Sequence, residues 1–193
     1  MGELLEQSFT EPGPGLAPLP GEAMRLLRQV AAPPRLGAHL RAVHDVAIQI
    51  VDWVGRSVDV DREAVLFGAA THDIGKAHFP GELSGPGAQH EAAGKALLVG
   101  LGVEPRLARF AARHGRWERD DDTLEDLLVT LADKIWKGAR EPGLEEQITQ
   151  RIAALEGEAV WAVYMRLDDE LTRIADGAEE RLAFQARFPT EGA

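Results

Sequence analysis

Residues 61–76, DREAVLFGAATHDIGK, carry the pattern on which the predicted fold rests. His72 and Asp73 follow Val65 at i+7 and i+8, so a helix places all three side chains near one face. Burying a carboxylate on such an apolar face is costly unless a compensating charge or hydrogen bond accompanies it. The stretch therefore predicts a helix whose inner end turns two polar side chains toward the protein interior.

The same helical spacing of apolar residues recurs along the chain, without the flanked alternation that is typical of strands. Asp61 is a suitable N-cap, and Thr123 with Asp126 three residues later resembles a capping box. Gly75 and Gly102 predict helix ends. The expected fold class is all-α, a single-domain helical bundle. The predicted helices cover 22–31, 35–55, 61–73, 89–101, 104–114, 123–138, 143–155 and 157–186.

Composition limits the domain organisation and the kind of site. The 193 residues suit one domain, and four prolines within residues 1–20 predict a flexible N-terminal arm. Because the chain has no cysteine, any metal must be held by imidazole and carboxylate. The chain has neither a secretory leader pattern nor an apolar run long enough to span a membrane, so we expect a cytoplasmic protein.

The charge balance limits the partners. The chain carries 21 lysines and arginines against 32 aspartates and glutamates, a net charge of -11. This balance disfavours attachment to extended nucleic acid or to an anionic membrane. A small anionic substrate remains compatible with it if positive charge is concentrated locally. The sequence leaves open whether the protein forms an oligomer.

All six histidines lie between residues 39 and 114, and four of them fall on the apolar face of their own predicted helix. Asp73 and Asp133 do the same, with no arginine or lysine on the same helical faces near them. A single buried imidazole is usually a hydrogen-bonded core residue, but this set favours a divalent metal ion. His39 lies about 140° around its helix from His44, so we leave His39 out of the predicted ligands. The four histidines are His44, His72, His90 and His114.

The order of these residues resembles the HD-domain superfamily of metal-dependent phosphohydrolases. The resemblance rests on His44, on the doublet His72-Asp73 within THDIGK, and on Asp133 within LADKIWKG. It covers about residues 38–140, and we assign 21–190 to an HD-type helical domain.

The resemblance also implies a ligand set. One divalent ion would be held by the histidines and aspartates of the motif, and branches with two ions add two further histidines, which match His90 and His114. Asp73 would then bridge the ions. The expected cofactor is one or two divalent ions, among Mn, Fe, Mg, Zn, Co and Ni. The complete predicted set is His44, His72, Asp73, His90, His114 and Asp133.

The implied activity is release of phosphate from a nucleotide or another small phosphorylated metabolite by metal-activated water. Asp73 and Lys76 are the predicted catalytic residues. Lys76 and Arg113 are the predicted substrate-binding residues, and Arg113 shares a helical face with Arg106 and Arg109. Three alternatives remain open: a phosphodiesterase or dinucleoside polyphosphate hydrolase, a diiron oxygenase with the same ligands, and a non-catalytic helical signalling module.

Overall fold

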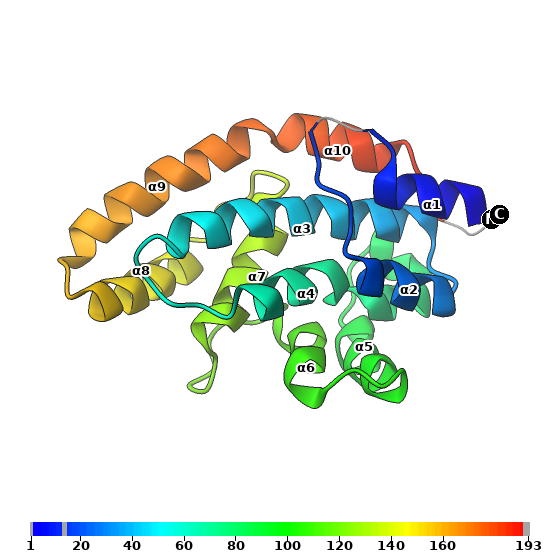
Figure 1. The fold of residues 1–193 in the computed structure, drawn as a ribbon, viewed down its shortest axis with the longest axis horizontal. Helices are drawn as coiled ribbons and strands as arrows, with labels where there is room; N and C mark the ends of the chain where they lie inside the picture. Colours follow the sequence, from blue (N-terminus) through cyan, green and yellow to red (C-terminus); the bar gives the residue numbers. More distant parts are fainter. Residues whose placement is uncertain (1, 13–14, 191–193) are drawn as a thin grey trace.

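The computed structural model describes residues 2–12 and 15–190, and all regular structure in these two ranges is helical (Figure 1). The expected all-α fold class is therefore confirmed. The α-helices are α1 (Gly2–Thr10), α2 (Gly21–Gln29), α3 (Pro34–Val54), α4 (Arg62–Thr71), α5 (Gln89–Gly100), α6 (Pro105–Arg113), α7 (Leu124–Ile135), α8 (Pro142–Glu156), α9 (Val160–Asp176) and α10 (Ala178–Ala186), and the short 3-10 helices are η1 (Ile74–Ala77) and η2 (Pro80–Leu83).

The predicted helix starts agree with the structure where a capping side chain supports them. Asp61 accepts a hydrogen bond from the Ala64 amide at 3.0 Å, at the start of α4. Thr123 and Asp126 form the reciprocal capping box at the start of α7. Satisfying these free amides stabilises each helix end by about 1 kcal/mol.

The predicted helix 157–186 is two helices, α9 and α10, which meet at Gly177. Arg181 donates a hydrogen bond to the Ile174 carbonyl at 2.5 Å, and a Cβ on Gly177 would lie only 2.8 Å from its Nη1 atom. The arginine thus donates to a carbonyl at the end of α9, close beside the glycine at which the two helices meet.

The N-terminal segment differs from the flexible arm that the prolines predicted. Residues Gly2–Thr10 form α1, and its apolar residues Leu5 and Phe9 are buried against neighbouring helices. Arg41 of α3 donates hydrogen bonds to the carbonyls of Glu11, Leu16 and Ala17. The i, i+4 spacing of Leu5 and Phe9 is a helical signal that the proline-rich composition obscured.

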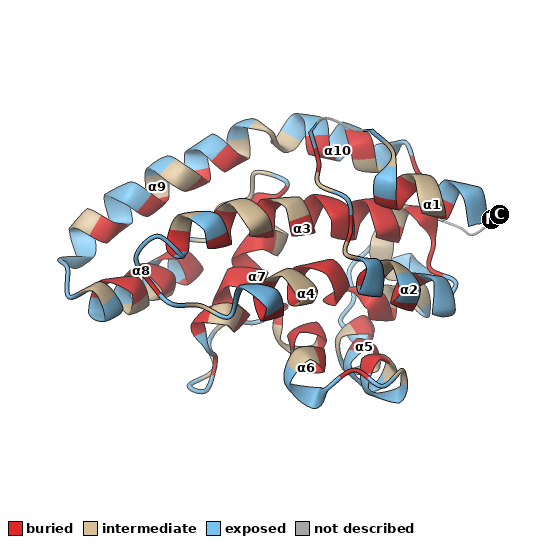
Figure 2. Cartoon of the chain, viewed as in Figure 1, coloured by how far each residue is buried: buried red, intermediate tan, exposed pale blue. Residues whose placement is uncertain are grey.

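Helix α3 is the central element of the fold. It packs against α1, α4, α7, α9 and α10, and residues 36–44 are buried without interruption (Figure 2). One large apolar core lies between α3, α4, α7, α8 and α9, and a second one lies beside α1, α2, α5 and α6. Polar side chains on α3 therefore face neighbouring helices rather than solvent.

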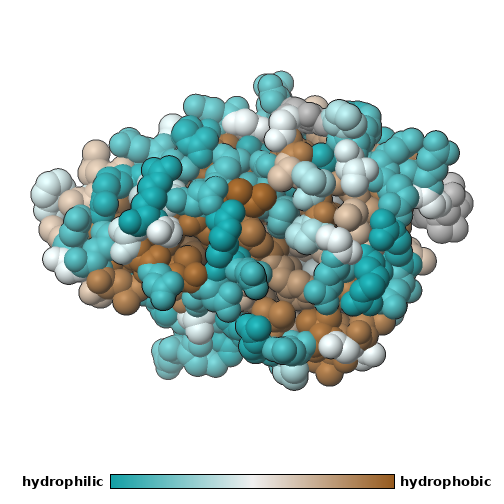
Figure 3. Space-filling view, viewed as in Figure 1, coloured by the Kyte–Doolittle hydropathy of each residue, from teal (hydrophilic) through white to brown (hydrophobic). Residues whose placement is uncertain are grey.

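The surface in Figure 3 is mostly hydrophilic, with apolar areas over α8 and near α5 and α6. None of the helices described combines the length and the apolar character that crossing a membrane requires.

Candidate metal centre

Three helical elements bring a first group of donor atoms together. His39 comes from α3, His72 and Asp73 follow the end of α4, and Asp133 comes from α7. One donor atom from each of the four residues lies within 4.8 Å of the others. The His39 Nε2 atom is 3.0 Å from Asp73 Oδ2, and the His72 Nε2 atom is 3.3 Å from Asp133 Oδ1. Two imidazoles and two carboxylates thus converge on one point.

A second group shares Asp73 with the first. His90 lies in the first turn of α5 and His114 caps the end of α6. Their Nε2 atoms are 3.0 Å and 3.2 Å from Asp73 Oδ1. The two oxygens of Asp73 therefore face different groups, because Oδ2 lies toward His39 and Oδ1 toward His90 and His114.

The hydrogen bonds of the rings orient their Nε2 atoms toward the centre. The Nδ1 atom of His72 lies 3.0 Å from the Ala69 carbonyl, and the Nδ1 atom of His90 lies 2.5 Å from Glu82 Oε2. These oxygens are acceptors, so each Nδ1 carries the proton and each Nε2 presents a lone pair. The Nε2 atoms of His90 and His114 are 3.2 Å apart. The Nδ1 atom of His114 lies 3.3 Å from the Phe110 carbonyl, so both Nε2 atoms can present lone pairs to a cation placed between them.

The separations of the donor atoms suit divalent ions. Ligands placed at right angles around an ion at roughly 2.1 Å are about 3 Å from one another, close to the separations of 3.0–3.3 Å above. Moreover, His72 Nε2 and Asp73 Oδ1 are buried without a hydrogen bond of acceptable geometry, as are both ring nitrogens of His39. The residues present therefore fit one or two ions.

Burial and charge act in opposite directions on the carboxylates. Burial alone would raise the pKa of Asp73, but the surrounding imidazoles, that of His72 first, hold this pKa well below its usual range. The pKa of Asp133 is lowered too, because its interaction with His72 outweighs the effect of burial. Both carboxylates are thus kept ionised, the form that binds a cation.

Two lysines supply part of the compensating charge, although none was expected on these faces. Lys76 Nζ lies 2.6 Å from Asp73 Oδ2, because η1 folds back beside the end of α4. Lys134 Nζ lies 3.5 Å from Asp133 Oδ2. Both lysines pair with carboxylates, so neither provides a partner for the lone pairs of the imidazole nitrogens.

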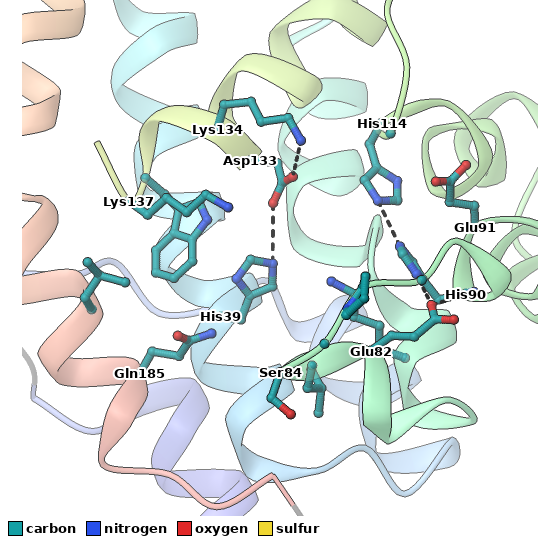
Figure 4. Close-up of a pocket in the computed structure, with 18 residues that line it drawn as sticks. His39, Glu82, Ser84, His90, Glu91, His114, Asp133, Lys134, Lys137 and Gln185 are labelled. Atoms are coloured by element: carbon teal, nitrogen blue, oxygen red, sulfur yellow. Dashed lines mark hydrogen bonds and ion pairs between the residues drawn. The ribbon is translucent and has the colours of Figure 1, made fainter. Parts of the chain in front are cut away.

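The donor groups open into a cleft of about 760 Å³ (Figure 4). Figure 4 shows His39 and Asp133 on one side of the cleft and His90 and His114 on the other. Three lysines line it together with the residues of the centre. They are Lys76, Lys134 and Lys137.

A family model described as the HD domain matches residues 36–136, just over half of the chain. The chain belongs to the HD-domain superfamily of metal-dependent phosphohydrolases. The matched range contains both donor groups and ends where α7 ends, beside the cleft. Comparisons with curated proteins and with solved structures found no match.

In this HD-domain protein, the histidine of α3 that lies in the first donor group is His39 and not His44. The structure does not bring His44 into either donor group. His44 is buried elsewhere on α3, where burial and the nearby Arg62 lower its pKa to about 4. Residues 36–44 are all buried, so both histidines of α3 have apolar neighbours in the sequence. The pattern of apolar residues therefore could not show which of the two histidines faces the donor groups.

Arg113 is not among the residues that line the cleft, and its role in substrate binding stays a prediction. Its guanidinium pairs with Asp121 and Asp122 at 2.5 Å and 2.9 Å. Arg109 pairs with Asp126, and Arg106 pairs with Glu104. The three arginines on this face of α6 are therefore engaged in ion pairs. The loop before α7 and the first turn of α7 present carboxylates to Arg113 and Arg109, and Glu104, just before α6, pairs with Arg106.

Glu82 belongs to the site, but the sequence offers no pattern that finds it. Its carboxylate accepts hydrogen bonds from the backbone amides of Gln89 and His90, both at 3.2 Å, besides its contact with the His90 ring. It comes from η2, within the glycine-rich segment between α4 and α5. Glu82 thereby fixes both the start of α5 and the orientation of a candidate ligand.

Gly75 is not the helix end that its position predicted. Helix α4 ends at Thr71, and Gly75 lies within η1 in contact with α5. A Cβ there would collide with the His90 carbonyl and lie 2.8 Å from the Gly94 amide nitrogen. Glycine is needed at this position because two backbone segments approach each other closely.

Proposed function

We propose that the protein is a metal-dependent phosphohydrolase that releases phosphate from a nucleotide or another small phosphorylated metabolite. The observation that carries this proposal is the position of Asp73, whose two oxygens face two donor groups beneath a lysine-lined cleft. The HD-domain family consists largely of metal-dependent phosphohydrolases, which supports the same reaction class.

The proposed ligands are His39, His72, Asp73 and Asp133 for one ion, and Asp73, His90 and His114 for a second. Divalent ions held there would acidify a water molecule and neutralise charge on the phosphate oxygens.

The chain's own residues account for the remaining requirements of hydrolysis. Asp73 Oδ1 lacks a hydrogen bond within the protein, so it can accept one from the attacking water. Lys76 lines the cleft and brings positive charge to the reacting phosphate. In the overall step, the water oxygen bonds to phosphorus, the bond from phosphorus to the ester oxygen breaks, and a proton passes to the leaving oxygen.

The donor set supports two alternatives as well. Phosphodiester or dinucleoside polyphosphate hydrolysis would use the same cleft, which is open to larger substrates. Diiron oxygenation would use the same imidazoles and the shared carboxylate. Iron content together with oxygen consumption, and without phosphate release, would favour the oxygenase.

The deciding experiment pairs elemental analysis of the purified protein with a phosphate-release screen over nucleotides and sugar phosphates. We expect one or two divalent ions per chain and turnover of at least one phosphomonoester. Loss of a residue that only supports a ligand typically lowers metal affinity roughly 10- to 100-fold. Asp73→Ala should lower it by more than that, because a direct ligand is lost, and should abolish phosphate release as well. Asp169→Ala, which changes an exposed carboxylate of α9, is the control. Undiminished turnover by Asp73→Ala would overturn the mechanism.

A further inference from the structure

One wall of the cleft is built by residues beyond the HD-domain match. Helix α10 follows the matched range by some forty residues, yet Leu182 and Gln185 line the cleft. Arg181 ties this helix in place, because its buried guanidinium donates to the Trp136 carbonyl at 2.7 Å and to the Ile174 carbonyl at 2.5 Å. The wall is therefore anchored to the end of α7, the helix that carries Asp133.

Lys137 stands on this wall without a carboxylate partner. It follows Asp133 by four residues, and it is exposed. Whereas Lys76 and Lys134 each pair with a carboxylate of the centre, no acidic oxygen of residues 2–12 or 15–190 is recorded within 4 Å of the Lys137 amine. In a chain of net charge -11, an unpaired cation in the cleft is a local attraction for anions.

The surroundings of Lys137 suit an organic group that carries an oxyanion. Figure 4 shows the Lys137 side chain reaching toward the space beside Asp133 and His39, with Gln185 on the same side of the cleft. The Gln185 amide offers hydrogen-bond donors, and the Leu182 side chain, 41% exposed, offers apolar contact. Lys137 and Gln185 lie on the opposite side of the cleft from His90 and His114.

We propose that Lys137 and Gln185 form a subsite for a second anionic group on the part of the substrate that is not hydrolysed. The inference rests on the proposed phosphohydrolase function and narrows its substrate class to small phosphate esters that carry another phosphate or a carboxylate. The reacting phosphate lies at the donor groups, the second anion pairs with Lys137, and the connecting carbon skeleton contacts Leu182.

The test compares three sugar phosphates that differ in the second anion. Glucose 6-phosphate has none, 6-phosphogluconate has a carboxylate, and glucose 1,6-bisphosphate has a phosphate. We expect the wild-type protein to favour at least one of the two doubly anionic compounds in kcat/KM. Lys137→Gln should lower that kcat/KM about tenfold, the size typical of a hydrogen bond to a charged group, and change the value for glucose 6-phosphate less than twofold. The preferred compound identifies the second anion as carboxylate or phosphate.

Three further variants complete the comparison. Lys137→Arg keeps the charge and should retain most of the preference, while Gln185→Ala should weaken it in the same direction as Lys137→Gln. Lys95→Gln removes an exposed lysine of α5 outside the cleft and is the matched control for charge. An equal loss for all three compounds, or no loss in Lys137→Gln, would overturn the subsite.

The failure of hydrolysis and the failure of the subsite are distinguishable. If the wild-type protein releases phosphate from none of the three compounds nor from the wider screen, the phosphohydrolase proposal fails. Calorimetric titration of the metal-loaded protein with the same compounds then judges the subsite. Tighter binding of a doubly anionic compound that Lys137→Gln abolishes supports it, and equal or undetectable binding of all three contradicts it.

Discussion

At the scale of single residues, His39 and His44 lie five positions apart on one helix and have different surroundings. The His39 Nε2 atom is 3.0 Å from Asp73, and its ring packs edge-on against Trp136 with centroids 5.0 Å apart. The His44 ring lies outside both donor groups, with its Nδ1 atom buried and without a partner. The two imidazoles therefore provide a matched pair of sites for substitution.

We expect His39→Ala to lower the affinity of the first donor group for its metal ion at least tenfold, because a direct ligand is lost. His44→Ala should keep the metal content of the wild type and lose only stability, by about 1–3 kcal/mol for a buried side chain. Elemental analysis and chemical unfolding of both variants measure these effects. A loss of metal in His44→Ala as large as that in His39→Ala would show that the assignment is wrong.

Glu82 acts on the centre through His90, since its carboxylate lies 2.5 Å from the Nδ1 atom of that ring. Replacing the carboxylate by an amide removes the negative charge that favours the proton on Nδ1. The Nε2 atom then becomes a weaker metal ligand. We expect Glu82→Gln to lower the affinity of the second group for Mn²⁺ by roughly 10- to 100-fold. Calorimetric titration with Mn²⁺ measures this, and the first group should be unaffected. Glu91→Gln removes another carboxylate of the same cleft and serves as the control; identical titrations for the two variants would count against this role.

At the scale of helices, the second donor group depends on how closely η1 approaches α5. A methyl group at Gly75 would meet the His90 carbonyl and the Gly94 amide, both of which are backbone groups that move only with the helix. We expect Gly75→Ala to cost about 1–3 kcal/mol of stability and to weaken metal binding by the second group, because α5 carries His90. Denaturant unfolding and metal titration measure both. Gly100→Ala, at the end of the same helix and in open space, should change neither; a normal second site in Gly75→Ala would refute the coupling.

At the scale of the whole molecule, the buried His44 links stability to pH. Burial lowers the pKa of His44 to about 4 in the folded protein. In the unfolded chain the pKa of a histidine is about 6.5. Protonation therefore favours the unfolded state, so this contribution to stability is present above about pH 6.5 and is lost as the pH falls toward about 4. The glutamine of His44→Gln does not titrate between these pH values. As the pH falls, the variant should therefore lose less stability than the wild-type protein, by on the order of 1–3 kcal/mol. Urea unfolding at several pH values measures the difference, and parallel curves would exclude His44 as the cause.

Local patterns in the sequence were enough to predict most of the helices and several residues of the two donor groups. Apolar spacing and capping side chains are properties of neighbouring residues, and they placed His72, Asp73 and Asp133 on inner helical faces that the structure does bring together. The structure also joins His90 and His114 to Asp73, as the resemblance to the HD-domain family implied.

The remaining features depend on contacts between segments that are distant in the sequence. Helix α3 is buried all round, so only its packing against α4 and α7 shows that His39 and not His44 meets Asp73. The bond from Glu82 to His90 exists because η2 folds against the start of α5. Leu182 and Gln185 of α10 line the same cleft as Lys137 because Arg181 anchors that helix to the Trp136 carbonyl. Spacing along one helix carries no information about which neighbour each face will meet, and that is why these three assignments required the packed structure.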